Sequence, residues 1–150
     1  MRLSLIRLAL VGAFVVCDAS ANTFSITPDI SSGNFSTYKW TIVQDGGAAQ
    51  SNPTLTLIAG QTYTFTANTS AIHPFWIKTV QEALGSAGAY PTGGTSGLDV
   101  NGVTSSAATM TFTPPASAEG TLYYNCGNHA SMTGLINVIV DPIFFNGFDP

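Results

Sequence analysis

The clearest structural signal in the chain lies in residues 121–140, which read TLYYNCGNHASMTGLINVIV. Two runs rich in β-branched and aromatic residues flank a short polar segment, which predicts strands at residues 121–125 and 135–140 joined by a tight loop. Cys126, His129 and Met132 follow one another there at intervals of three residues. The sequence therefore places a thiol, an imidazole and a thioether close together between two strands.

The rest of the chain has the same β character. Alternation with a period of two recurs between breaks of Gly, Pro, Asn and Ser, and helical periodicity is nearly absent after residue 21. In residues 61–67, aromatic residues alternate with threonines, as in a half-buried strand. Further strands are predicted at residues 23–27, 38–44, 54–58, 75–79 and 109–113, and a long surface loop at residues 85–106. The predicted fold class is all-β, an antiparallel sandwich or barrel.

The two ends of the chain differ from its middle. Arg2 and Arg7 accompany an apolar run at residues 8–16 that is too short to span a bilayer, and Ala-Ser-Ala at residues 19–21 is a small-x-small cleavage motif. We expect residues 1–21 to be a secretory signal peptide, residues 22–140 to be one domain and residues 141–150 to be a C-terminal tail. Lipidation of Cys17 is an alternative, which the bulky Val16 disfavours. The protein is thus expected to be exported, to the periplasm or out of the cell.

The tail itself reads DPIFFNGFDP. It resembles a short C-terminal tail of some exported bacterial proteins, with Ile-Phe, two further residues, and then Gly-Phe and an acid. The alternative is a segment whose aromatic residues dock on the domain or stay without structure.

The charges exclude one class of partner. After residue 21 the only cations are Lys39 and Lys78, against seven carboxylates. An acidic, sparsely charged chain argues against nucleic acid and against anionic membrane surfaces as partners. The acidic surface suits a basic redox partner, but it is also an ordinary feature of a soluble protein.

Cysteine and histidine usage points to a metal. Once Cys17 is removed with the signal, Cys126 is the only thiol in a protein exported to an oxidising compartment, where a metal bond would keep it from reacting. The only histidines are His73 and His129, and two imidazoles, a thiolate and the thioether of Met132 form the ligand set of blue-copper centres. The alternatives are a buried free cysteine, an ordinary strand-edge histidine and a core methionine. Zinc is a competing metal, although its structural sites usually recruit more Cys or His.

The residues YYNC (123–126), GNHASM (127–132) and GLINV (134–138), together with His73, resemble the cupredoxin family of small blue-copper proteins. The resemblance covers roughly residues 53–140 and implies a Greek-key β-sandwich or barrel of the cupredoxin type. The Cys-x₂-His-x₂-Met spacing is similar to the short amicyanin loop and is two residues shorter than the plastocyanin loop.

The resemblance also implies a role for each ligand of one type 1 copper per chain. His73 would be the upstream imidazole, Cys126 the thiolate, His129 the second imidazole and Met132 the axial thioether. His129 would also be the point where electrons leave. In many members an Asn follows the upstream His and offers its N–H to the sulfur. Pro74 has no N–H, which predicts a lower reduction potential.

Phe75 and Trp76 follow Pro74. They are candidates for an apolar wall that keeps water from the metal. Ordinary packing in the core is the alternative, and for Trp76 we expect the core.

The function expected from these features is one-electron transfer between Cu(II) and Cu(I), with an unidentified redox protein as the partner of a monomer. An enzyme is not expected, because no histidine is left for a second copper and no acid–base pair, nucleophile elbow or phosphate loop is present. Two other functions remain open at this point. One is copper storage or delivery without electron transfer, and the other is an interaction domain that keeps the fold with its metal unused.

Overall fold

The computed structural model describes residues 22–141, so the predicted signal peptide, Cys17 and nearly all of the predicted tail lie outside the described residues. Within them the chain forms nine strands. They are β1 (Thr23–Asp29), β2 (Lys39–Gln44), β3 (Gln50–Ser51), β4 (Leu55–Ile58), β5 (Tyr63–Ala67), β6 (Phe75–Lys78), β7 (Ala108–Phe112), β8 (Gly120–Cys126) and β9 (Thr133–Ile139). Three single-turn 3₁₀ helices complete the elements: η1 (Phe35–Thr37), η2 (Gly94–Ser96) and η3 (Ala116–Ala118). The all-β prediction is confirmed, and each of the eight predicted strands appears within two residues of its expected ends.

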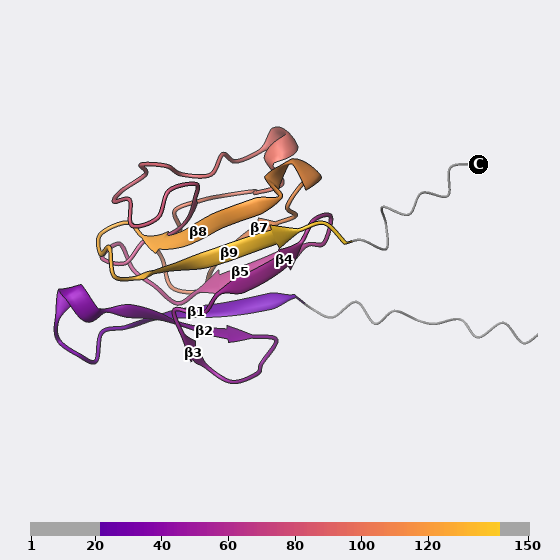
Figure 1. Cartoon of the computed structure of the whole chain (residues 1–150). Helices are drawn as coiled ribbons and strands as arrows, with labels where there is room; N and C mark the ends of the chain where they lie inside the picture. Colours follow the sequence, from indigo (N-terminus) through magenta and orange to yellow (C-terminus); the bar gives the residue numbers. More distant parts are fainter. Residues whose placement is uncertain (1–21, 142–150) are drawn as a thin grey trace, which may run out of the picture.

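The strands form two sheets that face each other (Figure 1). One has the order β3-β2-β1-β5-β7 and the other the order β4-β9-β8-β6. Five of the strand pairs are antiparallel, as expected of the sandwich, and two pairs, β1 with β5 and β4 with β9, are parallel. The physical reason is that these partners are far apart in the sequence, and the intervening chain returns each second strand to the same end of its sheet.

The core lies between the sheets and is rich in aromatic residues. In β5, Tyr63 and Phe65 are buried while the threonines between them are half-buried, as the alternation predicts. The Phe24 and Phe65 rings stack with their centroids 4.8 Å apart. Phe75 is also buried in this core, but the expectation for Trp76 is wrong, because Trp76 lies half-buried on the opposite face of β6. Successive side chains of a strand point to opposite faces of the sheet.

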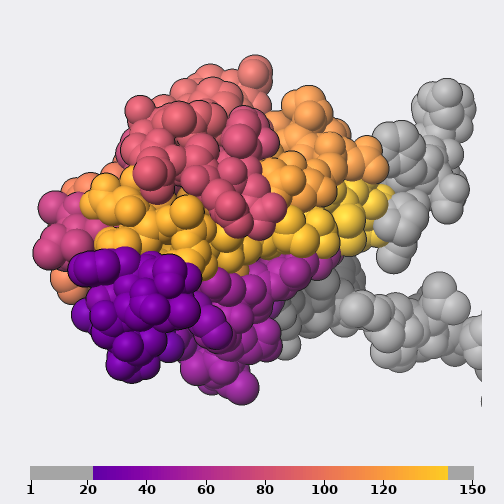
Figure 2. Space-filling view, turned by 60° about the vertical axis from the view of Figure 1, so that its left-hand side comes forward, coloured from indigo at the N-terminus to yellow at the C-terminus, as the bar shows by residue number. Residues whose placement is uncertain are grey.

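The loop that joins β6 to β7 (residues 79–107) covers this opposite face. It folds back on β6 through isolated bridges of Lys78 with Ala89 and of Phe75 with Val103. In Figure 2 it forms the pink to salmon layer over the orange and yellow strands. The prediction of a long loop at residues 85–106 is confirmed, and the loop protects an edge strand that would otherwise expose unpaired backbone groups.

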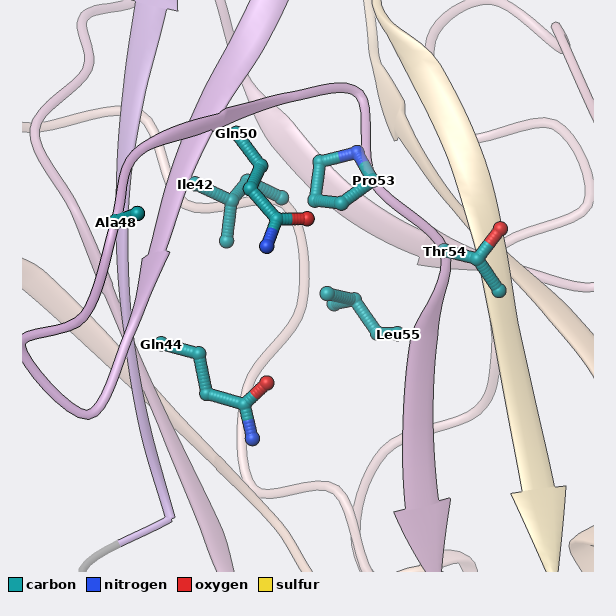
Figure 3. Close-up of a pocket in the computed structure, with 7 residues that line it drawn as sticks. All are labelled: Ile42, Gln44, Ala48, Gln50, Pro53, Thr54 and Leu55. Atoms are coloured by element: carbon teal, nitrogen blue, oxygen red, sulfur yellow. The ribbon is translucent and has the colours of Figure 1, made fainter.

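The surface has a small hollow away from the predicted ligands, and the helices were also compared with what a membrane span requires. Figure 3 shows a hollow beside β2, where Gln44 and Gln50 lie near Ile42 and Leu55. None of the residues that line it is titratable or a metal ligand of the usual kind, so we assign it no role. Among residues 22–141, no helix has the length and apolar character that crossing a membrane requires.

Candidate metal centre

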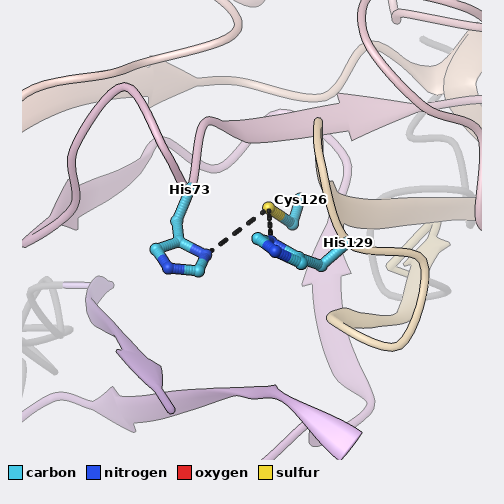
Figure 4. Close-up of side chains that lie close together, drawn as sticks. All are labelled: His73, Cys126 and His129. Carbon is cyan, nitrogen blue, oxygen red and sulfur yellow. Dashed lines mark hydrogen bonds between the residues drawn. The ribbon is translucent and has the colours of Figure 1, made fainter. Parts of the chain in front are cut away.

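The candidate ligands come from two neighbouring strands of the four-stranded sheet. Phe75 pairs with Cys126, so His73, two residues before β6, reaches the same end of the sheet as the last residue of β8. The ligand loop (residues 127–132) then carries His129 back over this end (Figure 4). Met132 closes the loop immediately before β9, and its side chain is fully buried.

Three of the four side chains meet around one point. The Sγ atom of Cys126 lies 4.0 Å from Nδ1 of His73 and 3.6 Å from Nδ1 of His129. One ligand atom from each of these three residues lies within 4.8 Å of the other two. A metal about 2.0 Å from nitrogen and about 2.3 Å from sulfur, with ligands about 120° apart, separates S from N by about 3.7 Å. The donor atoms therefore fit a single ion bound between them.

In the cluster formed by His73, Cys126 and His129, burial shapes the protonation of His73 and Cys126. Removal from water raises the pKa of the Cys126 thiol, against the opposing effects of backbone N–H groups from Asn128 and His129 and of the Lys78 charge. Burial also lowers the pKa of His73, and the neighbouring His129 lowers it further. Both shifts favour the neutral forms of Cys126 and His73, and a bound cation is what would compensate a thiolate there.

The ligand loop is held by its own backbone. The N–H of Cys126 donates to the carbonyl of Met132 at 2.8 Å, and the N–H of Met132 donates to the carbonyl of His129 at 3.2 Å. Asn128 donates its N–H to the Cys126 sulfur at 3.4 Å and its side-chain amide to the carbonyl of Ile72 at 2.8 Å. These bonds tie the loop to the segment that carries His73.

Pro74 takes part in this frame through its carbonyl. The N–H of Gly127 donates to the Pro74 oxygen at 2.9 Å. Because Pro74 has no N–H, the sulfur receives its backbone hydrogen bonds from the ligand loop alone among the described residues.

The facing sheet holds the loop from the other side. The indole Nε1 of Trp40, in β2, donates to the carbonyl of Met132 at 3.0 Å. The Asn52 side chain donates to the carbonyl of Ser131 at 3.0 Å and accepts from the N–H of Trp40 at 2.8 Å. Asn52 has a φ of +43°, which Asn tolerates better than most residues. Sequence reasoning missed both residues, since nothing local marks a contact across 79 to 92 positions.

Aromatic rings cover the cluster on its outer side. Phe35, in η1, stacks on the His129 imidazole with centroids 5.6 Å apart and planes 12° apart, although 68% of Phe35 is exposed. Tyr38 lies against both imidazoles, and its ring centroid is 5.9 Å from that of His73 and 5.4 Å from that of His129. The hydroxyl of Ser131 donates to the Phe35 carbonyl at 3.1 Å. The segment 35–38 was also missed from the sequence, where Phe35 stands outside any strand pattern.

Comparison with known proteins gives distant likenesses only. No family model matches the chain, and no curated protein matches it. Among solved structures, rusticyanin from Thiobacillus ferrooxidans is 21% identical, with 78% of this chain and 76% of that chain covered and a TM-score of 0.46. A purple cupredoxin from Nitrosopumilus maritimus is 18% identical, with 79% of this chain and 99% of that chain covered and a TM-score of 0.46. At these values the assignment of the site rests on its own geometry.

Proposed function

We propose that the chain is a type 1 copper protein of the cupredoxin family that carries one electron at a time. His73, Cys126, His129 and Met132 would hold one copper ion. The observation that supports this most directly is the convergence of the Cys126 sulfur and two imidazole nitrogens, one from each histidine of the sequence, at the end of a β-sandwich. A trigonal His₂Cys set with a weak axial thioether is the ligand set of blue-copper electron-transfer sites.

The frame around the site suits this role. Copper would supply a one-electron Cu(II)/Cu(I) couple when bound, and no proton need be exchanged. The residues of the chain keep the ligands in place, because hydrogen bonds fix the ligand loop to the His73 segment and, through Trp40, to the facing sheet. A ligand shell held on rigid strands changes little between oxidation states, so transfer costs little rearrangement.

Burial disfavours the alternative of copper delivery. Cys126 and Met132 are almost fully buried, and His73 is buried under Tyr38. A protein that accepts copper from this one would have to reach the ion past these side chains, whereas an electron need only cross the half-buried His129. The chain is therefore proposed to act as a carrier and not as an enzyme, with an electron-transfer protein as its partner.

Voltammetry on the copper-loaded protein tests the proposal. A carrier gives a reversible one-electron wave and keeps Cu(I) in the presence of a moderate excess of a Cu(I) chelator. Rapid loss of Cu(I) to the chelator would instead identify a delivery protein. Absence of any copper binding would leave only a domain with an unused metal site.

A further inference from the structure

Lys78 is a buried cation that hydrogen bonds link to the backbone of the ligand loop. It is the last residue of β6, and none of its surface is exposed, because the β6–β7 loop lies over it. Its Nζ donates to the carbonyls of Ala83 at 2.5 Å and Gly85 at 2.6 Å, and lies 5.7 Å from the centroid of the Trp76 ring. Carbonyl dipoles and a π face solvate the ammonium but leave its full positive charge in place. Burying a charge in this way is costly, and such a cost calls for a functional explanation.

Hydrogen bonds connect this cation to the metal ligands. The same Gly85 whose carbonyl accepts from Lys78 donates its N–H to the carbonyl of Gly127 at 2.7 Å. Gly127 in turn follows Cys126 and donates its own N–H to the carbonyl of Pro74, next to His73. Two glycine residues, Gly85 and Gly127, therefore link the ammonium to both segments that carry ligands.

A second side chain anchors the same part of the loop. Asn125, 1% exposed, donates its amide to the carbonyl of Val80 at 3.1 Å and accepts from the N–H of Glu82 at 3.1 Å. Hydrogen bonds from Lys78 of β6 and Asn125 of β8 thus hold residues 80–85 beside the backbone of the ligand loop. This makes Lys78 part of a frame and not an isolated surface charge.

The sign of the electrostatic effect follows from charge alone. When the copper–thiolate centre accepts one electron, its net charge becomes less positive by one unit. A nearby fixed positive charge stabilises the state with less positive charge, and a poorly hydrated surrounding strengthens the effect. Burial lowers the pKa of Lys78 and raises that of Cys126, and the charge of each residue acts on the other in the opposite sense, so the two groups interact electrostatically.

We propose that Lys78 is a positioning and tuning residue of the centre: it locks residues 80–85 onto the ligand loop, and its buried charge raises the reduction potential. The tuning half rests on the proposed copper function, whereas the positioning half does not. The electron comes from the electrode or from a reduced partner protein, and no bond or proton is exchanged.

Replacement of Lys78 tests the tuning half. Lys78→Met keeps the approximate shape and removes the charge, and Lys39→Met removes an exposed lysine as the matched control. We expect the Lys78→Met protein to have a potential at least 59 mV lower, which is a tenfold change for a one-electron couple, and Lys39→Met to stay near wild type. An unchanged potential in Lys78→Met would overturn the tuning role. A wild-type protein with no copper couple would instead refute the proposed function.

The positioning half is measured on the copper-free protein. Amide hydrogen exchange of Gly85 and Gly127 is expected to become at least tenfold faster in Lys78→Met and to stay unchanged in Lys39→Met. Unchanged exchange in a folded Lys78→Met protein would overturn the positioning role. Lys78→Gln keeps a hydrogen-bond donor but removes the charge, so it replaces Lys78→Met in both measurements if Lys78→Met does not fold. It should lower the potential with a smaller effect on exchange, and a wild-type potential in Lys78→Gln would also overturn the tuning role.

Discussion

The surroundings of Cys126 determine which proton a metal must displace when it binds. Burial raises the pKa of its thiol, so the thiol is protonated at pH 7, whereas the lowered pKa of His73 leaves that imidazole neutral there. A metal must therefore displace the thiol proton, and it need not displace a proton from His73.

The first prediction follows from this proton. Binding of Cu(II) at pH 7 should release about one proton from Cys126, so the apparent affinity should rise about tenfold per pH unit up to the pKa of the thiol. Potentiometric titration in weak buffer measures the release, and Cys126→Ser is the control that should release none. Copper uptake without proton release would mean that the thiol is not a ligand.

A second prediction concerns Pro74. Replacement by Asn gives residue 74 the N–H that, by the resemblance to cupredoxins, would donate to the sulfur, and it keeps the carbonyl that accepts from Gly127. A hydrogen bond worth about 1 kcal/mol corresponds to about 40 mV for a one-electron couple, so Pro74→Asn should raise the potential by about that much. Voltammetry on the two copper-loaded proteins makes the comparison, and a potential that does not rise would refute this role of Pro74.

Elements far apart in sequence build the support of the ligand loop. The loop itself lies between β8 and β9, but its carbonyls at Ser131 and Met132 are held by Asn52 and Trp40. The contact joins the two sheets at the candidate site.

Asn52→Gly isolates this contact. Glycine adopts the positive φ of residue 52 without strain, so the change removes mainly the side-chain hydrogen bonds. We expect a loss of about 1–2 kcal/mol in the free energy of unfolding, measured by urea titration of the copper-free protein, and faster amide exchange within residues 127–132. Equal exchange in the two proteins would show that the facing sheet does not hold the loop.

The strands were predictable because their alternation is local. In β5 the aromatic residues mark the core face and the threonines the other face, which fixes the element from a few positions. The site residues were predictable for another reason, since the chain has only two histidines and one thiol outside its first 21 residues. Strand β3 and helix η1 have two and three residues and carry no pattern. The half-burial of Trp76 depends on a loop that covers an outer face, which no local pattern reveals.

The whole molecule presents its candidate centre at one end of the sandwich. Strand β8 runs toward this end and β9 runs away from it, so the described chain finishes at the other end (Figure 1). The proposed domain therefore starts and finishes away from the ligands, and removal of the first 21 residues should leave the centre intact.

Export gives a prediction at this scale. Expressed with its full sequence in an export-competent bacterium, the protein should be recovered outside the cytoplasm with Asn22 as its first residue. Mass spectrometry of the intact protein reads the cleavage site directly. A retained N-terminus, or a lipid attached to Cys17, would refute the proposed signal peptide.

The most direct test of the metal centre is a titration of the purified copper-free protein with Cu(II), followed by visible absorption. We predict an intense thiolate-to-copper band that saturates at one copper per chain, and its complete loss in Cys126→Ser. A weak spectrum without saturation, or the same band in Cys126→Ser, would contradict the proposal that His73, Cys126, His129 and Met132 bind a single copper ion.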